Sequence, residues 1–162
     1  MAVFSMTSTM TLMGTGWTGT SPGGPGTQVV AGTITSTTDV SVMMTSVDVS
    51  LSADELDSTN FGSGGWRLKT AGLNSGTVQF NFNQDYAAST VDALFGIGGT
   101  FGFGTTFFVD IKPTNAARGT TNPSTVLSVV NLGYNPVSGS VGDLAVVSLT
   151  FPITGKPGRL TA

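Results

Sequence analysis

The chain has 162 residues, of which 9% are charged, a formal net charge of -3, and neither histidine nor cysteine. The lack of cysteine excludes disulfides and thiolate metal sites, and the lack of histidine removes the usual general base of enzymes that work near neutral pH. Charged residues make up about 25% of a typical soluble domain. A surface with so few charges must be rich in uncharged polar residues or covered by neighbouring copies, so we expect a non-enzymatic subunit of an assembly.

The length suits a single domain that spans residues 1–162. The N-terminal stretch lacks the basic residues of a signal peptide, and no apolar run approaches membrane-spanning length. We therefore expect a soluble protein without a membrane partner.

The N-terminal part alternates apolar and polar residues from Phe4 to Leu12, which predicts a half-buried strand. Residues 14–26 are rich in Gly, Thr and Pro, and this composition predicts a loop. Residues 28–38 predict a second strand. The segment 1–38 carries no charged side chain, and the role of this uncharged N-terminal arm, or pair of strands, stays open.

Residues 39–57 have a different character, with five acidic residues and no basic one. Within them, residues 40–51 alternate β-branched and polar residues and predict a strand in which Asp48 points away from the apolar side chains. Residues 52–65 read as a polar, glycine-rich connection. A clearer strand is predicted over residues 77–83, with its valine and phenylalanines facing inward.

One helix is predicted over residues 86–95, with Asp85 as its N-cap and Gly96 at its end. Its apolar residues at positions i, i+3 and i+4 form a stripe that would pack on a sheet. They are Val91, Leu94 and Phe95.

The C-terminal part predicts strands over residues 106–112, 125–134 and 144–150, followed by a loop-like tail over residues 154–162. Many short strands with one helix, and no alternation of strands with helices, indicate an all-β fold. We expect a β-sandwich or barrel with one flanking α-helix.

The hexapeptide Gly14–Gly19 matches the pattern G-x-G-x-x-G of dinucleotide-binding sites. Such a site needs a helix that starts at the last glycine, so that its amides meet the pyrophosphate. Pro22 and Pro25 follow instead, and they prevent a helix there. We interpret the match as a coincidence in a loop and expect no cofactor.

The acidic group Asp54, Glu55 and Asp57 could in principle supply a hydrolase with paired carboxylates or bind calcium. The residues lack the spacing and the glycine of an EF-hand loop, and no histidine is present to activate a nucleophile. We therefore interpret this group as a solvated or interface loop and predict neither a catalytic residue nor a metal site. The six basic residues are scattered, which argues against specific nucleic-acid binding.

Residues 47–66 contain the run Asp57-Ser58-Thr59-Asn60-Phe61-Gly62-Ser63, which resembles the D-x-T-x-F-G-S region of the major tail (tube) proteins of siphophages. As in that family, residues 71–73 (Ala-Gly-Leu), the alternating strand 77–82 and an aspartate-led helix follow in order. The end of the chain, from Gly142-Asp143-Leu144-Ala145 onward, is also similar. The resemblance covers roughly residues 45–160 and leaves residues 1–38 unmatched.

The resemblance implies a structural virion protein. In that family six copies of a helix-flanked β-sandwich close into a ring, and the rings stack into a tail tube around a channel that conducts DNA. The implied partners are further copies of the chain, tape-measure, tail-terminator and tail-tip proteins, and double-stranded DNA in transient, non-specific passage. The implied location is the virion tail, assembled in the cytoplasm of a bacterial host.

The resemblance also implies residue roles. Residues 52–66 occupy the place of the long loop that reaches the neighbouring ring, and Phe61 and Trp66 are its candidate anchors; Trp66 as an ordinary core residue is the alternative. Asp48 is the candidate for a side chain that faces the channel. The complete set of candidates in the inter-ring loop is Asp54, Glu55, Asp57, Thr59, Phe61 and Trp66.

Two other functions stay open at this stage. A head–tail connector or decoration protein of the virion would use a similar β-sandwich but would form closed rings or trimers and no polymer. A carbohydrate-binding or adhesin β-sandwich would need tryptophan or tyrosine side chains exposed in a groove.

Overall fold

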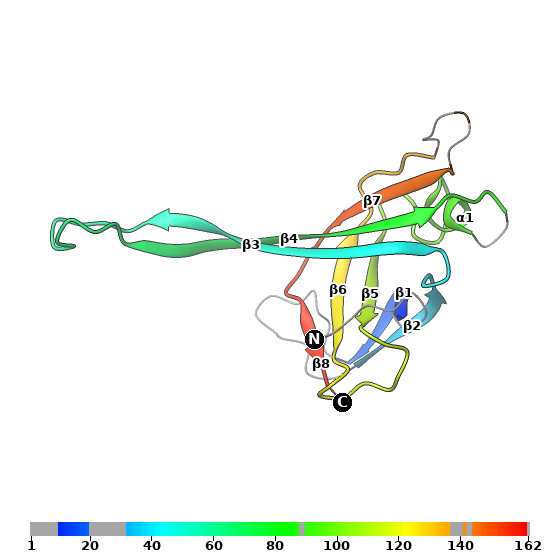
Figure 1. Ribbon diagram of the computed structural model, residues 1–162, viewed down its shortest axis with the longest axis horizontal. Coiled ribbons are helices and arrows are strands. Elements are labelled where there is room, and N and C mark those ends of the chain that lie inside the picture. Colours follow the sequence, from blue (N-terminus) through cyan, green and yellow to red (C-terminus); the bar gives the residue numbers. More distant parts are fainter. Residues whose placement is uncertain (1–9, 20–31, 88–89, 137–140, 142–143, 162) are drawn as a thin grey trace.

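The computed structural model describes residues 10–19, 32–87, 90–136, 141 and 144–161. Antiparallel strands form two sheets, one with the order β2-β1-β5-β6-β8 and one with the order β3-β4-β7 (Figure 1). The fold is therefore all-β with one short helix, as the sequence predicts. The elements are β1 (Met10–Gly19), β2 (Gly32–Asp39), β3 (Met44–Asp57), β4 (Lys69–Asn83), α1 (Val91–Phe95), β5 (Thr106–Lys112), β6 (Ser124–Val130), β7 (Val146–Pro152) and β8 (Gly158–Leu160).

The core lies between the two sheets and is built mainly from phenylalanines. Alternate residues of β4, β5 and β7 point inward, which confirms the period-two pattern that the sequence shows in these strands. Neighbouring phenylalanine rings have centroids 4.9–6.4 Å apart, within the range of favourable aromatic contacts. The rings belong to Phe80, Phe82, Phe95, Phe101, Phe107 and Phe151, all fully buried.

Residues 14–19, the described part of the loop predicted over residues 14–26, belong to strand β1. Gly14 and Gly16 lie inside β1, which pairs with β2. Glycine is required at both positions, because β2 leaves no space there for a side chain. A Cβ on Gly14 would lie 2.2 Å from Ile34 Cγ2, and a Cβ on Gly16 would lie 2.2 Å from Thr35 Oγ1. The glycines therefore mark a close approach of β1 to β2. A glycine-rich composition does not distinguish such an approach from a loop.

The helix is shorter than predicted. It spans Val91–Phe95 with Thr90 as its N-cap, so Asp85 does not start it. Asp85 instead accepts a hydrogen bond from the backbone N–H of Ala87 (2.9 Å) and the Thr90 hydroxyl bonds to the carbonyl of Asp85 (2.8 Å). Such local side-chain bonds compete with helical ones and shorten the element. The predicted apolar stripe is confirmed, since Val91, Leu94 and Phe95 are buried in the core.

The other boundaries shift by a few residues. The strand predicted over 125–134 ends at Val130, the one predicted over 144–150 runs from Val146 to Pro152, and the tail contains the unpredicted strand β8. β8 pairs with β6 and buries Leu160. Three residues are too few to show an alternating pattern, so this strand has no recognisable signal.

Residues 1–9, 20–31, 88–89, 137–140, 142–143 and 162, to which parts of the predicted strands, loop, helix and tail-tube resemblance refer, lie outside the described residues. The described part of the chain contains no helix that is long and apolar enough to cross a membrane.

The largest departure from the sequence prediction is the segment 52–66. The strand predicted to end at Leu51 continues to Asp57, and β4 begins at Lys69, eight residues before the predicted strand. Figure 1 shows the paired ends of β3 and β4 projecting far beyond the two sheets. We call residues 51–76 the arm. The predicted loop is thus the outer part of a β-hairpin.

Candidate assembly interface

The arm is an ordered, two-stranded structure. The β3–β4 ladder continues from Leu51↔Gly76 outward to Asp57↔Lys69, with one irregularity between Ala53 and Glu55. Beyond the ladder the tip is closed by a hydrogen bond from the N–H of Ser58 to the carbonyl of Leu68 (2.9 Å).

Two consecutive turns form the tip itself. The N–H of Ser63 donates to the carbonyl of Asn60, and the N–H of Trp66 donates to the carbonyl of Ser63, each over 3.1 Å. Gly64 and Gly65 have φ angles of 61° and 84°, a conformation that glycine adopts without steric cost. The glycine-rich composition of this stretch therefore specifies the turn of a hairpin.

All six residues that the sequence nominates for the inter-ring loop lie on the arm. Glu55 forms a solvent-exposed ion pair with Lys69 (2.7 Å). Asp57 accepts a hydrogen bond from the N–H of Thr59 (2.8 Å), and the Thr59 hydroxyl accepts one from the N–H of Leu68 (3.0 Å). The Thr59 hydrogen bonds lower the pKa of the Asp57 carboxyl below its usual value, so it stays ionised over the neutral range.

This geometry does not assemble the acidic residues into a chemical site. Glu55 is neutralised by Lys69, and Asp57 is occupied by the turn at Thr59. Among the described residues, no group of three or more carboxylates is placed to hold a metal ion. The acidic residues belong to an extended, solvated hairpin.

The arm tip exposes two large aromatic side chains. Phe61 is fully exposed and Trp66 is 80% exposed, so the alternative of Trp66 as a core residue is wrong. Large apolar groups that stay exposed on an ordered projection are typical of contact sites for another macromolecule.

The exposed face of the three-stranded sheet is polar and nearly free of charge. Asp48 lies on this face, as predicted, opposite Gln79 of β4. One row of side chains bonds across all three strands: the Asn81 amide donates to Ser46 (2.6 Å) and accepts from Ser148. Within the sandwich part of these strands (residues 44–50, 77–83 and 146–152) the other exposed side chains are uncharged, and they include Thr45, Ser50, Thr77, Asn83, Val146 and Thr150.

No strand of the described residues pairs with either outer edge of the same sheet. β3 and β7 are its outermost strands. The fourteen residues of β3 include four acidic residues, three of them on the arm, but no lysine, arginine or proline, and β7 has a proline only at its last position. Soluble proteins usually protect edge strands with such residues, because open edges pair with other chains. Both edges of this sheet are therefore suited to pairing with another copy.

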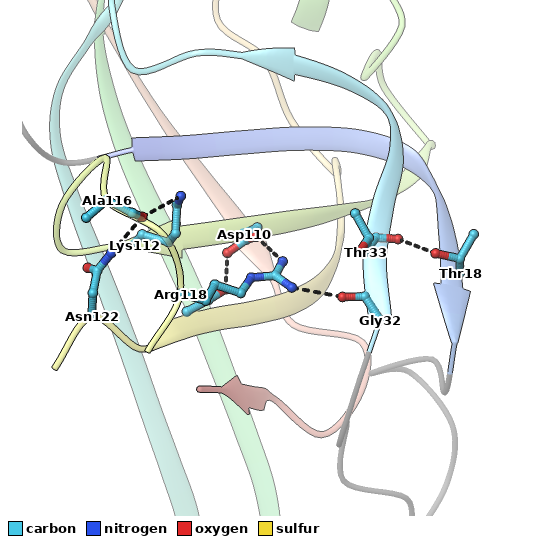
Figure 2. Close-up of polar contacts among 9 residues, drawn as sticks. Thr18, Gly32, Thr33, Asp110, Lys112, Ala116, Arg118 and Asn122 are labelled. Carbon is cyan, nitrogen blue, oxygen red and sulfur yellow. Dashed lines mark hydrogen bonds and ion pairs between the residues drawn. The ribbon is translucent and has the colours of Figure 1, made fainter. Parts of the chain in front are cut away.

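A buried polar cluster on the five-stranded sheet is the most enclosed group of charges in the described residues, and it ties the loop that carries Arg118 to β2 and β5 (Figure 2). Asp110 of β5, only 3% exposed, pairs with Arg118 (2.6 Å) and accepts a hydrogen bond from Ser124. Arg118 also donates to the carbonyl of Gly32 at the start of β2 (2.9 Å). This cluster is not among the predicted sites, although an aspartate within the apolar strand 106–112 is a signal for it.

Further hydrogen bonds hold the loop that carries Arg118. The Asn122 side chain accepts a hydrogen bond from the N–H of Thr114 (3.0 Å) and donates one to the carbonyl of Ala116 (2.9 Å). The same carbonyl accepts a second hydrogen bond from the ammonium group of Lys112 (3.2 Å) (Figure 2). These groups bond to one another and to the backbone. Together they form a structural clasp, by which we mean the set of bonds that holds this loop to the five-stranded sheet. None of these groups is positioned for catalysis.

Comparison with known proteins finds similarity among solved structures. No protein-family model matches the sequence, and no curated protein does. Among solved structures, the chain is similar to one from the "Virion of native gene transfer agent (GTA) particle", with a TM-score of 0.51 and 16% sequence identity. The similarity covers 72% of this chain and 84% of that one. At this identity it establishes a shared fold.

Proposed function

We propose that this chain is a structural virion protein without catalytic activity, and specifically the subunit of a phage tail tube. Copies form hexameric rings, and the rings stack around a channel that conducts DNA. Two independent findings support the virion assignment: the fold is similar to that of a chain from a gene transfer agent particle, and residues 57–63 resemble the tail-tube D-x-T-x-F-G-S region.

The observation that carries the proposal is the three-stranded sheet, with its two outer edges that no described strand covers and its polar, nearly uncharged face. β3 and β7 are both antiparallel to β4, so they run in the same direction. When β7 of one copy pairs with β3 of the next, every such contact relates two neighbouring copies in the same way. A head-to-tail contact of this kind closes into a ring, and the sheets then form one continuous inner wall without free edges.

The chemistry of the exposed sheet face suits a channel for DNA. Lysine and arginine on such a wall would bind phosphates by releasing counterions and would hold the DNA in place. The described strands of this face offer Ser, Thr, Asn and Gln side chains and the carboxylate of Asp48 instead. Asp48 is therefore our candidate for a side chain that faces the channel and keeps DNA sliding.

The arm suits the contact between successive rings. It projects from the sheet that would form the channel wall and ends in Phe61 and Trp66. A tube built in this way has two different ends, which would meet tail-tip and tail-terminator proteins, and its channel would hold a tape-measure protein before DNA passes. The subunit would be made in the cytoplasm of a bacterial host and work in the virion tail.

Negative-stain electron microscopy of the purified protein, at high concentration and over time, tests the proposal. Tubes of uniform width with a central channel and regular striations are the expected result. Closed rings that never stack would contradict the tube and favour a head–tail connector or decoration protein. A persistent monomer would contradict both, and glycan-binding assays would then test the carbohydrate-binding alternative.

The channel assignment has its own test in Asp48→Lys. Replacing the carboxylate by an amine adds a phosphate-binding group to the wall, so DNA ejection from particles that carry this variant should be slower than normal. Asp85→Lys makes the same charge change away from the sheet face and should leave the rate unchanged. Equal ejection rates for both variants and the wild type would remove Asp48 from the channel.

A further inference from the structure

The base of the arm carries an open groove of about 1080 Å³. Its walls come from the two strands of the arm and from residues 153–157, which follow β7. Leu51 and Leu73 are 59% and 80% exposed there, although both are large apolar side chains. The groove is therefore an apolar surface at the point where the hairpin leaves the sandwich.

Gly76 forms the floor of this groove. A Cβ at Gly76 would lie 2.7 Å from the end of Leu51 and 3.0 Å from the end of Ile153. The N–H of Ile153 donates to the carbonyl of Gly76 (2.9 Å), which fixes the 153–157 segment against β4. The absence of a side chain at Gly76 thus lets two apolar side chains converge over the backbone.

The chemistry of the groove favours an apolar partner over a small metabolite. A metabolite site usually has several converging polar groups in an enclosed pocket. The described residues that line this groove include one cation, Lys156, and no carboxylate. An occupant with large apolar side chains beside a carboxylate would complement it, and the arm tip has these features in Phe61, Trp66 and Asp57.

The tip cannot reach the groove of its own chain. The straight part of the arm, Leu51–Asp57, has seven residues and is about 23 Å long at 3.3 Å per residue. The part of β3 within the sandwich, Met44–Ser50, also has seven residues and the same length. A second copy displaced along the hairpin by the length of one sandwich would therefore bring its own groove beside the tip of the first.

We propose that the groove at the base of the arm receives the arm tip of a second copy. Phe61 and Trp66 lie against Leu51, Leu73 and Ile153, and the Asp57 carboxylate lies near Lys156. This inference rests on the proposed tube and names the residues that join one ring to the next. Each copy carries the tip and the groove at opposite ends of its arm, so the contact can repeat from copy to copy along the axis of the tube.

Engineered disulfides test the pairing, because the natural chain contains no cysteine to interfere. In the double variant Ser63→Cys with Asn74→Cys, one cysteine lies at the tip and the other at the groove. A disulfide needs Cα atoms within about 7 Å of each other, which excludes a bond within one chain. Oxidation of assembled protein should convert most of the monomer band on a non-reducing gel into a ladder of covalent oligomers.

The control variant pairs the tip with the opposite end of the sandwich, as Ser63→Cys with Thr100→Cys in the loop after α1. It should stay monomeric on the same gel. A ladder from this control and none from the groove variant would overturn the inference and place the tip at the α1 end. Tubes in the microscope without a ladder from either variant would also overturn it and leave the tube intact. Wild-type protein that forms neither rings nor tubes would overturn the proposed function together with the inference.

Discussion

The sandwich and the arm share strands β3 and β4, yet they use apolar residues in opposite ways. Along β4, Val78, Phe80 and Phe82 are fully buried between the sheets, whereas Leu73, a few residues earlier, is 80% exposed. The sandwich is stabilised by the packing of its buried side chains, whereas the arm has its ladder, its tip turns and exposed polar contacts such as the pair of Glu55 with Lys69. We therefore expect the arm to gain its packing from another molecule, as the proposed tube requires.

The first prediction concerns the core, where the difference from the arm is largest. Phe151→Ala removes a fully buried ring that contacts Phe80, Phe95 and Phe107. We expect it to lower the free energy of unfolding by about 3–5 kcal/mol, measured by urea denaturation. A loss as small as that of a surface substitution would show that the core is less tightly packed than the rings indicate.

A second prediction compares the two ion pairs of the described residues, one in each region. Asp110→Asn weakens the buried pair with Arg118 and should cost about 2 kcal/mol of stability. Glu55→Gln removes the exposed pair with Lys69 on the arm and should cost less than about 1 kcal/mol. Equal losses in thermal or urea unfolding would contradict the assignment of Asp110 as the clasp of the five-stranded sheet.

For the arm tip we expect an effect on assembly without an effect on folding. The double substitution Phe61→Ala with Trp66→Ala removes exposed side chains, so the free energy of unfolding should change by no more than about 0.5 kcal/mol. Tubes should be lost from negative-stain images, leaving isolated rings or monomers. Tubes of normal length from this variant would contradict the role of the tip.

The smallest effect is expected at high pH. Burial raises the pKa of the Tyr134 hydroxyl to about 12; its hydrogen bond to Asp92 (2.8 Å) acts in the same direction, and the one from Gln84 opposes it. The fold therefore favours the neutral phenol over an unfolded-state pKa of 10.0. This contribution to stability is fully present below pH 10 and is lost as the pH rises from 10 towards 12. Tyr134→Phe should flatten the pH dependence of the melting temperature in that range, and an unchanged curve would contradict it.

The parts of the fold that could be predicted from the sequence are those that bury a face. Residues 106–112 were predicted as a strand with the observed bounds, and Val78, Phe80 and Phe82 were assigned to the core, because alternation records which side chains face the other sheet. The helix stripe was correct for the same reason, while its start was wrong because local bonds at Thr90 compete with helical ones.

The arm could not be predicted as a hairpin, because it buries no face within its own chain. Its candidate residues are all exposed, in keeping with the solvated or interface loop that its acidic and glycine-rich composition predicts, and their role between rings stays a prediction. The glycines of β1 show the converse, because a close backbone approach and a loop have the same composition. The buried pair of Asp110 and Arg118 joins residues of a strand and a loop, and only the tertiary structure brings them together.

The position of β4 between β3 and β7 gives the arm a mechanical consequence. The arm has no joint at its base, because both of its strands continue into the sandwich. A pull on the tip along the hairpin is therefore passed to the seven pairs of the β4–β7 ladder, from Thr77↔Pro152 to Asn83↔Val146. Their hydrogen bonds lie across the direction of the pull, so they are loaded in shear all at once, and a chain of such subunits would resist stretching far better than peeling.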